Sequence, residues 1–505
     1  MVSVGRLCGH LRTARKVSPQ NCHSSVCNFD VHRRTLRGSV ANKDPRRQFL
    51  MSLDVLFLIV VLAVLLTGYP VGITLGGVSM LFAGVAYLFG TFDGALFLAL
   101  PSRLFGVMSN PVLVSVPLFV FMGLVLDRSR IAADMLRAAG ALFGGSPAGL
   151  TVSVTLVGML LAASTGIVGA SVVALGALAL PTMLRQGIPS HIASGCVAAA
   201  GTLGQIIPPS IVLIVLGDQM SNAWQKTQLD AGEFAPETVS VADLFAGALL
   251  PGLLLVGLYI AYQLVVTKQQ VSIEPPKDAT KPNNSLPVLI APILLIVSVL
   301  GSMLFGLATA TEAASVGAVG ALILAWGKLD RVKFQETVFE SGHLTAMIFL
   351  IVIGASMFSL VFRGLGGEET ITGFLTELPG GTYGALFMVM VAIFVLGFFL
   401  EFLEISFVIV PLVAPVLLAM PMADGSPMSP VWLGVLIALN LQTSFLTPPF
   451  GVSLFYLRSV APEEITTVLI YRGVMPFVVL QLLALLIVVF FPMLATFLPR
   501  FLFGG

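Results

Sequence analysis

Charged residues are scarce in this sequence. Only 10% of the 505 residues are Asp, Glu, Lys or Arg, whereas 57% are hydrophobic. A soluble domain usually carries about a quarter charged residues, so this chain could not cover its surface in water, and lipid is the expected solvent. The 50 glycines and 30 prolines fall inside apolar segments, where broken transmembrane helices tolerate them.

Cysteine pairs and enzyme signatures are also lacking. Of four cysteines, Cys8, Cys22 and Cys27 lie near the start and Cys196 lies alone, so no disulfide framework or zinc site is predicted. The net charge of +1 excludes a nucleic-acid footprint. No zincin, nucleophile-elbow or nucleotide-binding loop is present. We therefore expect a protein that is not an enzyme, has no cofactor and takes energy from an ion gradient.

Residues 1–50 differ from the rest because they hold ten of the 26 lysines and arginines and no long apolar run. They contain no secretory signal. A transit peptide is one interpretation; a disordered basic extension that is not native is the one we favour, with Met51 as an ordinary membrane-protein start.

The apolar runs predict an all-α polytopic membrane protein. A spanning helix needs about 20 apolar residues, and ten segments qualify: 53–67, 70–90, 112–127, 190–217, 240–266, 286–305, 309–327, 342–361, 430–458 and 473–497.

Two further apolar stretches, 150–185 and 384–420, have polar or Gly-rich centres between short arms. This pattern predicts re-entrant helical hairpins; one kinked span or a pair of ordinary spans in each stretch is the alternative.

The two halves of the chain match at an offset of about 240 residues, which pairs Pro208-Pro209 with Pro448-Pro449. Each half has five crossings, an odd number, so the halves should be inverted. Interrupted helices at matching positions of inverted repeats are typical of a secondary transporter. We predict a first repeat at 51–267, a polar cytoplasmic linker at 268–285 and a second repeat at 286–505.

Loop charges set the orientation. In this predicted topology, twelve of the sixteen lysines and arginines after residue 50 fall on one side of the membrane. The positive-inside rule makes that side cytoplasmic. The mature N-terminus at Met51 and the C-terminus then both face outward, which is the periplasmic side in a bacterium. The four basic residues on the outer side are Arg103, Lys226, Arg363 and Arg500.

Paired prolines should unwind two spans in mid-membrane. The segments are Gly201–Ser210 and Asn440–Gly451, and their freed carbonyls are suitable ligands for Na⁺. A simple proline kink is the alternative. Candidate ion-binding residues here are Gly204, Pro208, Ser210, Thr443, Thr447 and Gly451.

The hairpin tips supply the other candidates, which are Ser164, Thr165, Gly166 and Ser171 in the first and Glu401, Glu404 and Ser406 in the second. Intramembrane carboxylates are costly and normally line a cavity or meet a partner; either glutamate could balance a cation or take a proton. The alternative is that bulk water solvates the tip. For Glu312 we favour a role at a helix N-terminus, where a carboxylate is favourable.

Three motifs, Leu203–Ser210, Thr309–Ala314 and Thr447–Gly451, resemble the large membrane subunit (the DctM-like permease) of tripartite ATP-independent periplasmic (TRAP) transporters. The resemblance covers 51–505. It implies an elevator-type transporter with a scaffold and a mobile domain, driven by Na⁺, which takes up organic acids across the bacterial inner membrane. It also implies a separate small four-helix membrane subunit and a periplasmic substrate-binding protein.

The sequence departs from many members at both tips, with Ser164–Gly169 in place of a Gly-Ser-Ser type and with Glu401 in place of Asp. The substrate-binding residues and the substrate itself stay open. A two-repeat anion symporter that needs no binding protein is the alternative transporter. A channel or a non-transporting scaffold is the alternative of a different class, and the paired breaks argue against it.

Overall fold

The structure is a computed structural model that describes residues 45–129, 131–142, 146–166, 168–270 and 285–504. Contacts divide the chain into Met1–Phe49 and Leu50–Gly505, and the description below concerns the second unit. Its described residues form helices and no strand, which confirms the all-α fold class. Of the predicted extension, residues 1–44 lie outside the described residues, as do 271–284 of the predicted linker.

The helices of the first half begin with α2 and end with α11. They are α2 (Pro45–Leu65), α3 (Val71–Leu88), the 3₁₀ helix η1 (Gly94–Ala99), α4 (Leu100–Met108), α5 (Pro111–Arg128), α6 (Ile131–Leu142), α7 (Pro147–Thr165), α8 (Val168–Arg185), α9 (Ser190–Thr202), the 3₁₀ turn η2 (Leu203–Gln205), α10 (Ile211–Asp230) and α11 (Val241–Gln270).

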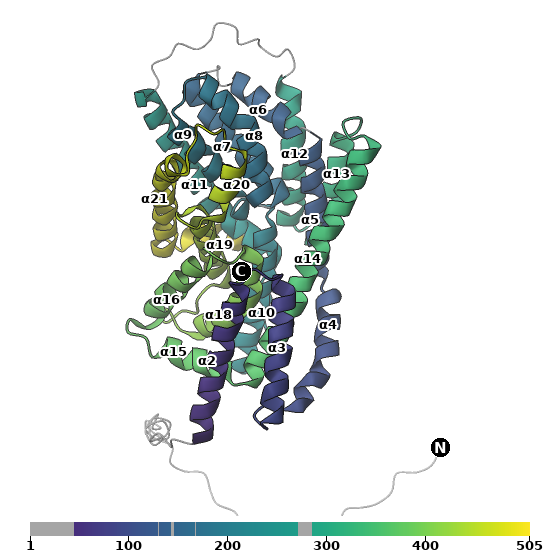
Figure 1. Ribbon diagram of the computed structural model, residues 1–505, viewed down its shortest axis with the longest axis vertical. Helices are drawn as coiled ribbons and strands as arrows, with labels where there is room; N and C mark the ends of the chain where they lie inside the picture. Colours follow the sequence, from purple (N-terminus) through teal and green to yellow (C-terminus); the bar gives the residue numbers. More distant parts are fainter. Residues whose placement is uncertain (1–44, 130, 143–145, 167, 271–284, 505) are drawn as a thin grey trace, which may run out of the picture. The chain divides into compact units, whose positions relative to one another are not determined.

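The second half runs from α12 to α22, and Figure 1 labels most of its helices. Its helices are α12 (Ser285–Leu304), α13 (Ala310–Leu324), α14 (Arg331–Gly364), α15 (Gly367–Thr376), α16 (Gly381–Leu396), α17 (Phe402–Glu404), the π-helical turn η3 (Ile405–Ile409), α18 (Val410–Ala419), α19 (Pro430–Leu446), α20 (Val452–Val460), α21 (Thr467–Phe490) and α22 (Met493–Phe503).

Seven of the described helices are long and apolar enough to cross a membrane, and several shorter apolar helices accompany them. Every predicted span coincides with a helix or a pair of helices. The stretch predicted as one span at 473–497 is interrupted, because α21 ends at Phe490 and α22 begins after Pro492. The inversion of the two halves is not decided by this order of helices and stays a prediction.

The chain turns at both predicted hairpins. Gly166 separates α7 from α8, and 397–401 separate α16 from α17. The arm α8 and the arm formed by α17, η3 and α18 each have the length of a full span, so re-entry from one face remains a prediction.

The hairpins connect the two halves. In the first hairpin, α8 packs on α9 of its own half and on α20 of the other half. In the second, α16 packs on α19 of its own half, and α18 packs on α10 of the other. Each hairpin therefore lies between the first part of one broken helix and the second part of the other. Elsewhere, α14 packs against α3 and α5, and α5 also contacts α10.

Three short helices, α4, α6 and α15, were not among the predicted elements. They have 9 to 12 residues, too few to cross a bilayer, so a search for long apolar runs passes over them. Glu312 has the predicted helix-start role: Thr309 and Glu312 form a reciprocal capping box at the start of α13.

Candidate functional site

The first broken helix consists of α9 and α10, with the segment 203–210 between them. η2 continues α9 for one turn, and Ser210 then takes an extended backbone before α10 begins. Prolines at 208 and 209 supply no N–H donor. Ser210 donates its hydroxyl proton to the Gln205 carbonyl at 3.1 Å. This bond spans the break and leaves the serine lone pairs available to a ligand.

The second broken helix consists of α19 and α20. Thr447 ends α19 with an extended backbone, and its hydroxyl donates to the Thr443 carbonyl at 2.7 Å. Thr443 in turn donates to the Leu439 carbonyl at 2.8 Å. Both hydroxyls have given up their protons within the helix, so their oxygens can act only as acceptors or cation ligands. Both X-Pro bonds at the paired prolines, Pro208-Pro209 and Pro448-Pro449, are cis.

Gly451 begins α20 where carbonyls converge. A Cβ at this position would lie 2.7 Å from the Phe445 carbonyl oxygen and 2.9 Å from that of Thr447. The glycine thus keeps two carbonyl oxygens close to the start of a helix. The Phe445 carbonyl already accepts from the Ser453 hydroxyl at 2.6 Å and the Thr447 carbonyl from the Gly451 N–H at 2.9 Å, so each keeps one lone pair for a further ligand. Carbonyls at helix breaks coordinate Na⁺ in broken-helix transporters.

Both second parts of the broken helices start inside the protein. No side chain of the described residues caps the first turn of α10 or of α20. Their free N–H groups carry the positive end of the helix dipole. A bound anion or a neighbouring carboxylate would be favourable at these ends.

The first hairpin tip fits between the two broken helices. Gly166 adopts a left-handed conformation with φ of 61° and ends α7. A Cβ on Gly166 would lie 2.7 Å from the Ile211 side chain, and one on Gly169 would lie 2.7 Å from the Tyr456 ring. The tip therefore touches the start of α10 and also α20. Ser171 is buried and has an interaction partner; the side chains of Ser164 and Thr165 lie outside the described residues.

The second hairpin tip carries two glutamates with different surroundings. Glu401 is exposed and precedes α17, whereas Glu404 is only 7% exposed. The two residues form a capping box in which the Glu401 N–H donates to Glu404 Oε2 at 2.7 Å. Glu404 is thus the buried carboxylate of the tip. Its other oxygen accepts no hydrogen bond from the described residues.

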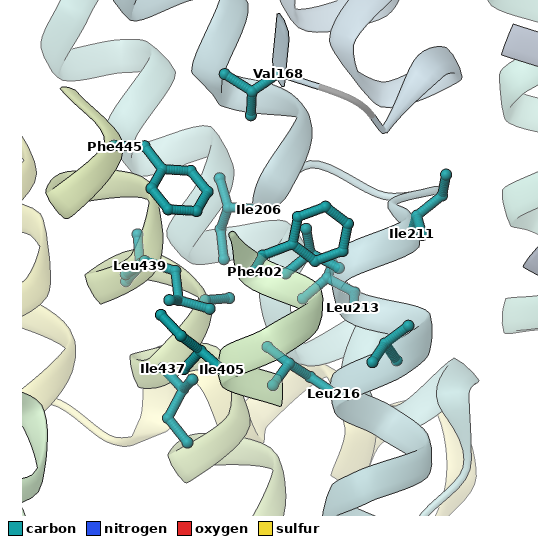
Figure 2. Packing of buried hydrophobic residues seen from close by; sticks show 14 of the residues in the cluster. Val168, Ile206, Ile211, Leu213, Leu216, Phe402, Ile405, Ile437, Leu439 and Phe445 are labelled. Atoms are coloured by element: carbon teal, nitrogen blue, oxygen red, sulfur yellow. The ribbon is translucent and has the colours of Figure 1, made fainter. Parts of the chain in front are cut away.

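A cluster of apolar side chains surrounds these elements. Figure 2 shows Phe402 and Ile405 of the second hairpin among side chains from α10, α19 and the first break, which include Ile206, Leu213, Leu216, Leu439 and Phe445. Packing of this kind excludes water and strengthens any charge interaction within it.

Three buried polar side chains in this region have no partner. Gln205 and Gln442 are 0% exposed, and none of their amide atoms bonds to any described residue. The Ser406 hydroxyl at the start of η3 is equally buried and equally unpaired. An unsatisfied buried polar group costs about 1–3 kcal/mol, so such groups mark a place where a ligand or water is expected.

The sequence prediction included Ser406 and missed Gln205 and Gln442, although both lie inside the motifs that flank the paired prolines. A polar amide in an otherwise apolar span was the available signal. The remaining predicted residues fall into two groups. Gly166, Gly204 and Ser210 lie along the first break and tip, and Thr443, Thr447 and Gly451 lie along the second break.

Gly204 holds the first break against the first hairpin. A Cβ on Gly204 would overlap the carbonyl of Ala162 in α7. In the second half, a Cβ on Gly397 of the hairpin would overlap the Ser444 side chain of α19. Each break therefore packs closely on the first arm of the hairpin in its own half.

Known proteins resemble this chain over most of its length. The family described as tripartite ATP-independent periplasmic transporter, DctM component, matches residues 58–494. The C4-dicarboxylate TRAP transporter large permease protein DctM of Pseudomonas aeruginosa is 28% identical over 80% of this chain and 90% of its own. The ectoine/5-hydroxyectoine permease UehC of Ruegeria pomeroyi and the sialic acid permease SiaM of Vibrio cholerae are each 26% identical, over 88% of this chain and 98% and 97% of their own.

Solved transporter structures share the fold. The YdaH transporter of Alcanivorax borkumensis superposes with a TM-score of 0.55 at 14% identity, covering 81% of this chain and 89% of its own. MtrF of Neisseria gonorrhoeae gives 0.52 at 10% identity, covering 81% and 84%. With a family match that spans both hairpins and both broken helices, the chain belongs to the DctM family of TRAP transporters and is a membrane permease subunit, not an enzyme.

Proposed function

We propose that this chain is the large permease subunit of a tripartite transporter that takes up a small organic acid across the inner membrane, driven by a Na⁺ gradient. The observation that carries the proposal is the meeting of two broken helices with two hairpin tips. Carbonyls, hydroxyls and one buried carboxylate lie along these four segments. Oxygen ligands are those that hard cations prefer.

Two cation sites are proposed, one in each half. The first uses the Gly166 turn and the break from Gly204 to Ser210. The second uses Glu404 and Ser406 with the break from Thr443 to Gly451. Gln205 and Gln442 supply amide oxygens that no described residue engages. Moving one net charge through 100 mV adds about 2.3 kcal/mol of driving force.

The proposed substrate class follows the relatives. Their names specify C4-dicarboxylates, ectoine and sialic acid, which are small molecules that carry a carboxylate. The tripartite family implies a small membrane subunit and a periplasmic binding protein as partners. This family match favours the tripartite reading over an anion symporter that needs no binding protein.

Reconstituted uptake tests the coupling. The chain is placed in proteoliposomes with its small subunit, and the binding protein is supplied with succinate, ectoine or sialic acid. Uptake should require an inward Na⁺ gradient and should increase with an inside-negative potential. Equal uptake with K⁺ alone on both sides and no pH gradient would contradict sodium coupling.

Cysteine labelling tests the proposed orientation. Lys328 lies between α13 and α14, and Asp424 lies between α18 and α19, and both are exposed. The loop charges place them on opposite sides, with Lys328 in the cytoplasm. Cysteines at these positions should react with an impermeant reagent from opposite faces of the membrane. Reaction of both from outside would rule out the predicted inverted topology.

A further inference from the structure

A polar cavity of about 330 Å³ is lined by none of the residues named for the two proposed cation sites. Its walls come from α4, the start of α5 and α14 on one side, and from α10 with η3 and α18 on the other. The polar lining consists mainly of Arg103, Asn110, Asp218, Asn222, Ser356 and Arg363. Two arginines in a cavity between apolar helices require an explanation, because charges inside a membrane protein normally meet a partner.

The two arginines lack sufficient partners. No carboxylate among the described residues forms an ion pair with Arg103. Arg363 lies 3.7 Å from Glu368, but Glu368 also pairs closely with Lys226. Asp230 also attracts Arg363, whereas Arg103 repels it. Two guanidinium groups thus line one cavity and repel each other, which an anion between them would relieve.

The one carboxylate in the lining is already satisfied. Asp218 Oδ1 accepts from Asn110 at 2.8 Å, and Oδ2 accepts from Gln219 at 2.9 Å and from Asn222 at 3.4 Å. These amides spread the carboxylate charge and hold Asp218 at the wall. The carboxylate is therefore not the counter-ion of either arginine in the described structure.

We propose that this cavity binds the carboxylate group of the transported solute through Arg103 and Arg363. The inference rests on the proposed uptake of an organic acid and adds the group that recognises it. Guanidinium groups pair with carboxylates in a planar, two-bonded geometry. The cavity also has room for a small acid, since ligand pockets commonly measure about 300–1,000 Å³.

The position of the cavity suits a docking site. Phe407 and Pro411 line it, and they follow the second hairpin tip directly. Asp218 lies two turns after the first break. A solute held here touches the same hairpin and the same broken helix that form the proposed cation sites. Arg103, Lys226 and Arg363 are also three of the four basic residues for which the loop charges predict the outer side.

A charge-sensing label tests the proposal without knowledge of the substrate. Ser356 lines the cavity and is replaced by cysteine in a chain in which Cys8, Cys22 and Cys27 are serine; Cys196 is fully buried and stays. The purified complex is treated with an anionic and a cationic methanethiosulfonate reagent of similar size. The ratio of the two reaction rates reports the potential at residue 356.

The cavity should favour the anionic reagent. Removal of one arginine charge should lower the rate ratio about tenfold, because the two reagents carry opposite charges and their rates change in opposite directions. Arg103→Gln and Arg363→Gln should each show this loss, and Arg103→Lys and Arg363→Lys should keep most of the ratio. Arg500→Gln, which changes a basic residue in α22 that does not line the cavity, is the matched control.

Competition identifies the bound group. Acetate should slow the anionic reagent more than the same concentration of chloride does, and this difference should vanish in Arg103→Gln. An unchanged rate ratio in both glutamine variants would overturn the proposal, as would equal slowing by acetate and chloride. Loss of the anionic preference only in nanodiscs that contain phosphatidylglycerol would assign the cavity to a lipid headgroup instead. Sodium-independent uptake with an intact rate ratio would contradict the proposed coupling and leave this site standing.

Discussion

The two hairpins meet the broken helices by different means. The first is fitted by shape: Gly166 and Gly169 bring its tip against Ile211 and the Tyr456 ring. The second packs Phe402 and Ile405 among apolar side chains of both broken helices, while Glu401 and Glu404 cap each other within its tip. Shape alone can orient backbone carbonyls, whereas a buried carboxylate adds a full charge. We therefore expect the second half to bind its cation more strongly.

Substitution of the closely packed glycines should have the largest effect on stability, and the size of the effect should differ between the two halves. Gly204→Ala places a methyl group on the Ala162 backbone carbonyl, which cannot move without the helix. Gly397→Ala places one against the Ser444 Oγ, which can rotate away, and 2.9 Å from the Ser444 Cβ, which needs only a small shift. Overpacking costs about 1–3 kcal/mol. The loss of stability should lie at the upper end of this range for Gly204→Ala and at the lower end for Gly397→Ala. Thermal unfolding of the purified complex measures both losses. Gly257→Ala in α11, where a Cβ meets open space, is the control. Equal losses at Gly204 and Gly397 would show that the second break is as rigidly packed as the first.

Substitution of the unpaired amides should change stability and transport in opposite directions. Gln205→Leu and Gln442→Leu remove groups that have no partner in the described structure, so each should raise the unfolding free energy without Na⁺ by about 1–3 kcal/mol. Both should reduce uptake. Unfolding in denaturant and Na⁺-dependent uptake are measured on the same preparations. A variant that loses stability instead would show that its amide has a structural role, and it would remove that half from the proposed sites.

Substitution of each glutamate in turn tests which carboxylate of the second hairpin binds the cation. Glu404→Gln keeps the acceptor for the Glu401 N–H but removes the buried charge. Loss of one charge-assisted contact weakens cation binding by about 1–3 kcal/mol, or roughly five- to hundred-fold in affinity. The Na⁺ concentration for half-maximal uptake should rise accordingly.

Glu401→Gln should show a smaller rise, because Glu401 is exposed. If both variants match the unchanged chain, water solvates the tip and neither carboxylate binds the cation. If Glu404→Gln loses only its pH dependence, the second site carries a proton and the sodium ion belongs to the first half.

The hydroxyls at the breaks should give the smallest effects. Thr447→Val and Ser210→Ala each remove one neutral oxygen, together with the hydrogen bond that its hydroxyl donates to the backbone carbonyl of Thr443 or of Gln205. A neutral ligand contributes about 0.5–1.5 kcal/mol, so the Na⁺ requirement should rise about two- to tenfold. A larger effect of Ser210→Ala than of Thr447→Val would reverse the expected order of the two sites.

The sequence by itself determined the membrane class, the positions of both breaks and both hairpins, and the family. These features have local signals. An apolar run of the right length predicts a span, and paired prolines interrupt a helix whatever tertiary contacts it makes. The capping of α13 by Thr309 and Glu312 is equally local.

Only the tertiary structure decided which polar groups are buried and which of them meet. The sequence treats Glu401 and Glu404 alike, but the turn after Gly397 leaves one exposed and buries the other. Arg103 and Arg363 line one cavity because α4 and α14 lie side by side there. Burial and pairing depend on which helices pack together, and here each hairpin packs on helices of both halves, so segments far apart in the chain surround each hairpin.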